Sequence, residues 1–393
     1  MVGIDVGATK IIRSNGSSFP LPPHVLSRHL LLRVAADLPI VQIYGTRCNL
    51  ATAHGTYAAA VAAALQEQQL GDLQDPPIAL AVPGWWSPQT LTRVGTALAA
   101  EGVHAHLVND AEAAVTEVQH QGHSLPDNVA VVSLRASHSS VVIVKNCTQQ
   151  PTAMLSPCDV IGEGGDDLDA AVLRHVVAGL THLGDDIPVR DSQTIASAQE
   201  VLRQCRGLRE ALSTSATESM LPQLPRAGHR IRMVRSELEE LAEPWIDSVL
   251  EMVTRTIEAS STSVDMVLLT GGVAAMPLVS QRLSADLALE VLVPEDPTFV
   301  TVRGAERLFA SRTKPAARNR SLWHLVKQVG PRRKHEVGTD TTATHEPPLP
   351  SKLQAAEHIM SPGIDSPTVS SADDVLDERD AQPKVRAESL VKP

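Results

Sequence analysis

The sequence predicts an α/β fold, because short apolar strands alternate with amphipathic helical stretches and glycine turns repeatedly follow the strands. Hydrophobic residues make up 43% of the 393 residues and charged residues 20%, which is typical of globular domains. Aromatic residues make up only 2%, so we expect a core of leucine, valine, isoleucine and alanine. A chain of this length can form two lobes of ordinary size with additional segments.

The expected strands and helices are recognised by their spacing. Strands are short apolar runs that end at turn residues, and the two runs near residue 135 are close enough to pair as a hairpin. Helices are stripes of apolar residues at intervals of three and four. The predicted strands are Val2–Val6, Ile78–Val82, Val103–Val108, Val129–Leu134, Ser140–Lys145 and Met266–Leu269, and the predicted helices are Asp166–Ala178, Glu237–Glu258 and Pro277–Leu287.

The composition changes sharply near residue 311, so we place the globular part at residues 1–310. Residues 311–335 contain eight Lys or Arg and no Asp or Glu, whereas residues 336–393 contain eleven acids, five bases and seven prolines. A segment of the latter composition cannot bury enough apolar surface to offset the entropy of ordering it. We therefore predict a disordered, acidic, Pro/Ser/Thr-rich tail over residues 336–393.

The basic segment contains a possible amphipathic helix over residues 318–329. Such a helix suits an anionic membrane surface or a groove on a protein partner. A short terminal helix docked on its own lobe is the simpler interpretation, and the alternatives stay open. The apolar face would consist of Leu322, Trp323, Leu325, Val326 and Val329.

Charge and hydropathy exclude several classes of partner. The net charge of −11 disfavours nucleic-acid binding, because an acidic surface repels phosphate. No apolar run reaches the roughly 20 residues that span a bilayer, and no charged-then-apolar leader opens the chain. The four cysteines show no C-x-x-C spacing, which favours reduced thiols. We therefore expect a cytoplasmic protein.

The first candidate site lies where an apolar strand delivers Asp5 into a tight turn of Gly7, Ala8, Thr9 and Lys10. A carboxylate at a strand end beside exposed N–H groups suits a magnesium–phosphate site, because the amides bind phosphate and the acid reaches the metal's water shell. The spacing is not that of a P-loop. The alternative is an ordinary strand and turn in which Asp5 caps the backbone locally.

The second candidate site is the glycine pair Gly271–Gly272, which follows a predicted strand and precedes a helix. Glycines at this place let a nucleoside approach the backbone closely, and the helix offers its N-terminal amides. The alternative is a strand-to-helix turn that needs glycine only for a positive φ.

Five blocks in fixed order resemble the DnaK-type family of seventy-kilodalton heat-shock chaperones. They are VGIDVGATK, ALAVPGWW followed by HLVNDAEAAV, IGEGGDDLDAAVLRHV, CRGLREALSTS, and VDMVLLTGGVAAMPLVSQRL with the later VRGA. The resemblance implies an actin-like, two-lobed nucleotide-binding domain built from duplicated ribonuclease-H-like lobes. It places lobe I at residues 1–130, with a shortened insertion at about 20–77. Residues 131–310 would hold the second phosphate-loop segment, lobe II and the return to lobe I.

The resemblance also implies ligands and roles for individual residues. ATP and magnesium would bind between the lobes, with Asp5 and Asp110 as the catalytic acids that hold the metal through water. The implied cofactor-binding residues are Gly7, Ala8, Thr9 and Lys10 at the first phosphate loop, Gly164 and Gly165 at a helix start, Arg209 and Ser213 at the nucleoside, and Gly271 and Gly272 beside the adenosine.

The second phosphate loop departs from the family pattern Asp-Leu-Gly-Gly-Gly-Thr. Residues 133–138 read SLRASH, so the acid is lost and side chains obstruct the amides that would crowd a phosphate. Arg135 or His138 could donate to phosphate instead, although bulky side chains in a loop are more often solvated. The adenine-stacking arginine aligns with Ala275, and residues 20–77, where the family carries its catalytic lysine, contain no lysine. Hydrolysis should therefore be several powers of ten slower.

Three functions are compatible with these observations. The favoured one is an Hsp70-like, chaperone-related ATP-binding protein with weak or lost ATPase activity that acts as a nucleotide-dependent scaffold or regulator. A protein partner or client would engage the nucleotide lobe or the tail, because nothing after Ala310 alternates as the strands of a substrate-binding domain would. The alternatives are an active protein-folding chaperone ATPase and a sugar kinase of the repressor–kinase–open-reading-frame type, with Asp110 as general base.

Overall fold

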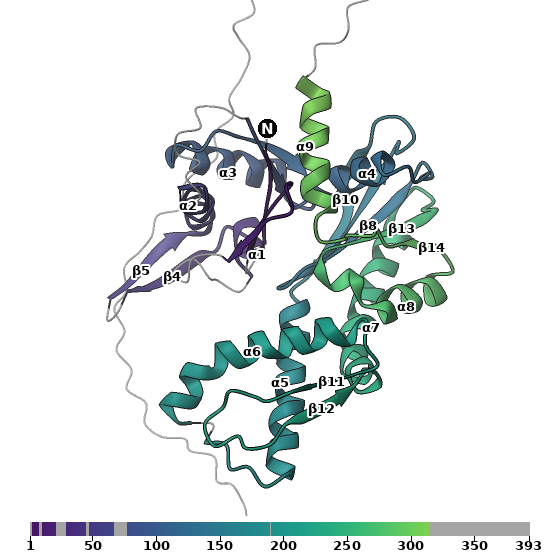
Figure 1. The fold of residues 1–393 in the computed structure, drawn as a ribbon. Helices are drawn as coiled ribbons and strands as arrows, with labels where there is room; N and C mark the ends of the chain where they lie inside the picture. Colours follow the sequence, from purple (N-terminus) through teal and green to yellow (C-terminus); the bar gives the residue numbers. More distant parts are fainter. Residues whose placement is uncertain are drawn as a thin grey trace, which may run out of the picture. The chain divides into compact units, whose positions relative to one another are not determined.

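Two five-stranded sheets with the same strand order form the framework of the protein (Figure 1). In each sheet the first three strands form an antiparallel meander and the last two add in parallel. This repetition confirms the α/β fold with duplicated ribonuclease-H-like halves. In spatial order the first sheet is β3 (Ser18–Pro20), β2 (Lys10–Arg13), β1 (Val2–Val6), β6 (Ile78–Val82) and β7 (Ala105–Asn109), and the second is β10 (Thr152–Ile161), β9 (Ser139–Lys145), β8 (Val129–Leu134), β13 (Met266–Thr270) and β14 (Glu290–Leu292).

The computed structural model describes residues 2–7, 10–20, 29–44, 47–66, 77–188 and 190–313, all of which belong to one compact unit. Several predictions fall elsewhere. Ala8 and Thr9 of the first predicted phosphate loop, the amphipathic helix at 318–329 and the tail at 336–393 lie outside the described residues. The proposed boundaries at residues 130, 310 and 335 also remain predictions.

Three helices pack with the first sheet. They share one buried cluster with β1 and β6, in which Tyr57 and Trp86 are the largest side chains. The two rings meet edge to face at 5.5 Å, and the Trp86 Nε1–H donates to the carbonyl of Leu31 at 3.2 Å. This cluster holds the strand that carries Asp5. The helices are α1 (Leu30–Ala35), α2 (Ala53–Gln66) and α3 (Pro88–Ala100), and the hairpin β4 (Pro39–Tyr44) and β5 (Arg47–Thr52) precedes α2.

A larger group of helices follows in the second half of the chain. It shares the largest apolar cluster of the described residues with β8 and β13, and its first two helices contact each other more than the sheet. A small two-stranded sheet contacts α5 and α6 (Figure 1). The helices are α5 (Gly165–His182), α6 (Ser192–Leu212), α7 (Arg235–Ala259) and α8 (Pro277–Leu287), with the short η2 (Gly272–Ala275), and the small sheet consists of β11 (Thr217–Met220) and β12 (Ile231–Val234).

Helix α4 (Asp110–His120) connects the two sheets. One side of it packs with β8 and β13, and the other packs with β6 and with α9 (Val300–Thr313). Arg307 of α9 donates to the buried carboxylate of Glu117 on α4 at 2.5 Å. Because α4 is held from both sides, its first residue, Asp110, is fixed relative to both sheets.

The predicted elements agree with the structure to within a few residues. The helix expected at Asp166–Ala178 extends over Gly165–His182, and the strand expected from Val103 begins at Ala105. The N–H of Val103 donates to the carbonyl of Leu98 at 2.9 Å, so this residue closes α3 instead of opening the strand.

Within the described ranges, no helix is long and apolar enough to cross a membrane. Cys147 and Cys205 are free thiols. Burial raises the pKa of Cys147 and Cys205 to about 12, so both stay protonated at neutral pH.

Candidate functional site

The turns that follow β1 and β8 have the same construction. In the first turn the N–H of Gly7 donates to the carbonyl of Lys10 at 2.9 Å. In the second turn the N–H of Arg135 donates to the carbonyl of His138 at 3.1 Å. Each hydrogen bond closes a four-residue turn between two antiparallel strands, so Arg135 takes the place of Gly7.

The strand registers extend this equivalence to the residues before the turns. Asp5 pairs with Ile12 on β2, and Ser133 pairs with Ser140 on β9, so each pair encloses the same number of residues. Asp5 and Ser133 therefore occupy equivalent positions in the two sheets. One turn keeps the acid and the glycine, whereas the other carries a hydroxyl and a guanidinium.

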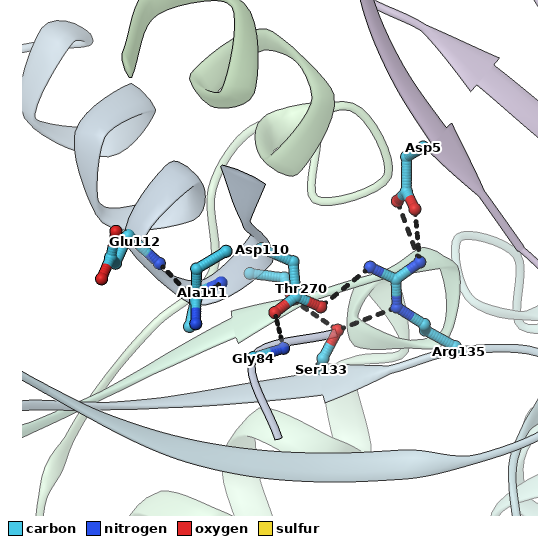
Figure 2. Close-up of polar contacts among 9 residues, drawn as sticks. Asp5, Gly84, Asp110, Ala111, Glu112, Ser133, Arg135 and Thr270 are labelled. Carbon is cyan, nitrogen blue, oxygen red and sulfur yellow. Dashed lines mark hydrogen bonds and ion pairs between the residues drawn. The ribbon is translucent and has the colours of Figure 1, made fainter. Parts of the chain in front are cut away.

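Arg135 links the second turn to both predicted acids (Figure 2). Its Nη1 donates to both carboxylate oxygens of Asp5, at 2.9 Å each, and its Nη2 donates to Oδ2 of Asp110 at 3.1 Å. The Arg135 side chain is 12% exposed and each of the two carboxylates 7%, so the ion pairs are shielded from water. Asp5 and Asp110 thus converge, as predicted, but they converge on a residue of the chain itself.

Asp110 is oriented by the backbone as well as by Arg135. Its neighbour Asn109 caps α4 by accepting from two N–H groups of the first turn, and the N–H of Gly84 donates to Oδ1 of Asp110 at 2.8 Å. Burial raises the pKa of Asp110, while the charge of Arg135 opposes that rise. Both of its carboxylate oxygens are therefore engaged by the protein.

The guanidinium of Arg135 remains charged and fixed in place. Burial disfavours its charged form, but the carboxylates of Asp5 and Asp110 outweigh burial and raise the pKa of Arg135. Its Nε donates to Oγ of Ser133 at 3.3 Å, and that oxygen accepts from Oγ1 of Thr270 at 3.1 Å (Figure 2). The side chain is thus held by three elements.

The start of α5 is hydrogen-bonded to the second turn, and nucleotide contact by Gly164 and Gly165 stays a prediction. The N–H of Gly165 donates to the carbonyl of Arg135 at 3.0 Å, and that of Asp166 donates to the carbonyl of Ala136 at 2.7 Å. A Cβ on Gly164 would lie 2.5 Å from the carbonyl oxygen of Arg135, so only glycine allows this close approach. These helix N-terminal amides are satisfied by the chain.

Arg209 and Ser213, the predicted nucleoside contacts, lie on and just after α6. The Nε of Arg209 donates to Oδ1 of Asp169 at 2.7 Å, and Arg206 donates to the other oxygen of the same carboxylate at 2.8 Å. Ser213 ends the helix and donates to the carbonyl of Arg209 at 3.3 Å. Arg209 and Asp169 are both buried, so this ion pair joins α6 to α5.

Gly271 and Gly272 share a small cavity with the first predicted site. Gly271 has φ +91°, and a Cβ there would lie 2.2 Å from the carbonyl oxygen of Leu134. The cavity has a volume of about 60 Å³, far below the roughly 300–1,000 Å³ of typical ligand pockets. Its lining is formed by Asp5, Gly7, Lys10, Ile12, Ser133, Arg135, Ala136, Gly271, Gly272, Thr298 and Thr301.

The sequence indicated solvated or phosphate-binding side chains in the second turn, and this expectation was wrong for His138. The residue is 1% exposed, and its ring meets the ring of Trp85 edge to face at 5.9 Å. Burial, followed by the charges of Arg135 and His29, lowers the pKa of His138 to about 3. The imidazole is therefore neutral.

The duplicated sheets and the acid-bearing first turn define an actin-like nucleotide-binding domain. A family model described as Hsp70 protein matches residues 66–292, which is more than half of the chain. The chain therefore belongs to the Hsp70 protein family, as its sequence blocks indicated.

Individual relatives match parts of the chain. The chaperone protein HscA homolog of Bordetella pertussis is 31% identical over 174 residues, which are 42% of this chain and 26% of that protein. A heat shock protein homolog of Saccharomyces cerevisiae is 26% identical over 220 residues, 53% of this chain and 31% of that protein. The HscA homolog of Bordetella petrii is 29% identical over 147 residues, 36% of this chain and 22% of that protein. The matched region is thus less than a third of each relative's length.

Members of this family in general bind ATP with magnesium, but the described residues do not fit a metal held by Asp5 and Asp110. The guanidinium of Arg135 already lies between the two carboxylates. Among the residues that the structure describes, no group of three or more His, Cys, Asp and Glu side chains is arranged to hold a metal ion.

Proposed function

We propose that this Hsp70-family chain has lost ATP turnover, or retains it only very slowly, and acts as a scaffold or regulator that does not depend on a magnesium–ATP cycle. The observation that carries the proposal is the pairing of Arg135 with both Asp5 and Asp110. These are the two acids that the family resemblance assigns to the metal.

The physical reason lies in how phosphoryl transfer is catalysed. Its catalysis rests on positioning and on stabilising charge at the transferred group, with metal ions bridging the phosphates. Here the acids are neutralised by a side chain, and the amides at the start of α5 donate to the carbonyls of Arg135 and Ala136. The carboxylates and the backbone amides therefore already have partners within the chain.

The alternatives are less well supported by the same geometry. A sugar kinase would need Asp110 as a general base, yet both of its oxygens accept hydrogen bonds, from Gly84 and from Arg135. An active chaperone ATPase would need Arg135 to leave two buried carboxylates, and leaving those charges unpaired is unfavourable.

The test is ATP hydrolysis by the purified full chain and by Asp5→Asn, each with magnesium and at matched concentration. We expect the wild type to release phosphate no faster than the variant. Robust turnover by the wild type that disappears in Asp5→Asn would overturn the proposal. A second assay with hexoses separates the remaining alternative, because phosphate transfer to a sugar would identify a kinase.

A further inference from the structure

We propose that Asp5 and Asp110 form a latent divalent-cation site in which the guanidinium of Arg135 is the resident cation. The inference deepens the proposed function and rests on it. The wild-type chain would then exclude a metal ion from this place, and removal of the Arg135 side chain would create a site that binds a divalent metal ion.

The two carboxylates are placed so that one cation can contact both. Asp5 comes from the end region of β1 and Asp110 from the start of α4, and both reach the same planar group (Figure 2). The contacts with Arg135 are 2.9 Å on one side and 3.1 Å on the other. Two carboxylates separated by the width of a guanidinium suit a cation that keeps part of its water shell, which is how magnesium commonly binds.

The charges of the two carboxylates and of Arg135 do not cancel fully. Two carboxylates that are each 7% exposed carry two negative charges, and the contacting guanidinium supplies one positive charge. Without that cation, two like charges would remain buried close together, which strongly favours binding of any cation that fits. A divalent ion would neutralise both.

The anchoring of Arg135 explains why the wild type should not exchange it for metal. The Nε of Arg135 donates to Ser133, its N–H donates to the carbonyl of His138, and its carbonyl accepts from Gly165. The guanidinium is thus placed by the backbone and side chains of its own turn. A metal ion would have to displace a preorganised, covalently tethered cation.

The experiment compares the full-length wild type, Arg135→Ala and the double variant Arg135→Ala with Asp5→Asn. Manganese binding is measured by electron paramagnetic resonance of the free ion, and thermal unfolding is measured with magnesium chloride against sodium chloride of equal ionic strength. We expect the wild type to retain no manganese and to show no magnesium-specific shift in Tm. Arg135→Ala should bind one manganese per chain, and saturating magnesium should raise its Tm by on the order of 5 °C. The double variant should lose both effects.

Two results would overturn the latent site. One is manganese binding by the wild type that Asp5→Asn abolishes, and the other is a folded Arg135→Ala that binds no manganese. If Arg135→Ala unfolds in the absence of metal, refolding from urea with magnesium decides: recovery with magnesium alone supports the site, and failure with both salts contradicts it. Neither result involves ATP turnover, so failure of the latent site would leave the loss of turnover standing, whereas hydrolysis by the wild type would overturn the proposed function.

Discussion

The turn after β1 and the turn after β8 occupy the same place in two sheets of identical strand order, yet they differ in chemistry. Both are closed by the same backbone hydrogen bond over four residues. The first has Asp5 on its strand and Gly7 in the turn, and the second has Ser133 and Arg135 at the equivalent positions. The second turn has lost an acid and gained a base, and that base now pairs with the acid that the first turn kept.

This difference teaches how one backbone serves two purposes. A glycine in the turn has no side chain that could reach a neighbouring acid, whereas an arginine in the same turn can reach across and neutralise the opposite acid. Arg135 is mostly buried and bridges two carboxylates, and we propose that it stands in the place of an exchangeable cation. Substitutions in and beside the two turns should therefore differ in their effect on stability.

Removing the charge of Arg135 should have the largest effect on stability. Arg135→Met keeps much of the side-chain volume but leaves Asp5 and Asp110 buried without their cation, which should lower the free energy of unfolding by about 3–5 kcal/mol. Urea denaturation measures the loss. The matched control is Lys10→Met in the first turn, which is exposed and should change stability by less than about 0.5 kcal/mol. Equal losses of stability in Arg135→Met and Lys10→Met would contradict the difference between the two turns.

The close packing of the second turn on Gly271 should produce the next largest effect. Gly271→Ala places a Cβ at φ +91° and 2.2 Å from the backbone of Leu134, so we expect a loss of about 2–3 kcal/mol. In Gly272→Ala the nearest atom to the new Cβ, on Thr298, is 3.8 Å away, and the change should stay below about 0.5 kcal/mol. Chemical denaturation of this neighbouring pair checks the prediction. A stability of Gly271→Ala equal to that of the wild type would contradict this close contact with the end of β8.

The buried imidazole of His138 should make stability depend on pH. Its pKa in the folded chain is about 3, below the ordinary 6.5, so between these values the unfolded chain binds a proton that the folded chain does not. Stability should therefore fall as the pH falls, by about 2 kcal/mol between pH 7 and pH 5. His138→Gln should remove that part of the dependence, whereas the exposed His123→Gln should keep it. Identical pH profiles for the wild type and His138→Gln would refute a neutral, buried imidazole.

The hydroxyl that replaces the acid in the second turn should have the smallest effect. Ser133→Ala removes an acceptor for Arg135 and for Thr270, and we expect a loss of about 1 kcal/mol. Adding Thr270→Val should recover part of that loss, because the unpaired hydroxyl is removed as well. A double-mutant cycle by thermal unfolding measures the coupling, and strict additivity would argue against the hydrogen bond.

Much of the fold could be predicted from the sequence, because its strands are short apolar runs that end at glycine or proline. No residue range was assigned from the sequence to the shorter elements, to strand β10 or to helices α2, α3, α4, α6 and α9. The alanine-rich helix α2 shows one reason. In α2, Tyr57, Ala58, Ala60, Val61 and Ala62 are all buried, so the helix lacks the contrast between apolar and polar faces on which periodicity depends.

The site was predictable in part. Asp5 and Asp110 were singled out, and they converge; whether they and the neighbouring glycines bind a nucleotide stays a prediction. The role of Arg135 was not foreseen, because its partner Asp5 is 130 residues away in the chain and the direction of its side chain depends on how the two sheets meet. The loss of an acid and gain of a base in equivalent turns was the one sequence signal that could have indicated it.

The affinity of the wild-type chain for ATP, titrated calorimetrically with and without magnesium, tests most directly whether Arg135 has replaced the metal. A resident guanidinium predicts that magnesium makes no difference to the binding of ATP, whether that binding is weak or absent. Magnesium-dependent binding that is tenfold tighter or more, and that Asp5→Asn abolishes, would contradict it.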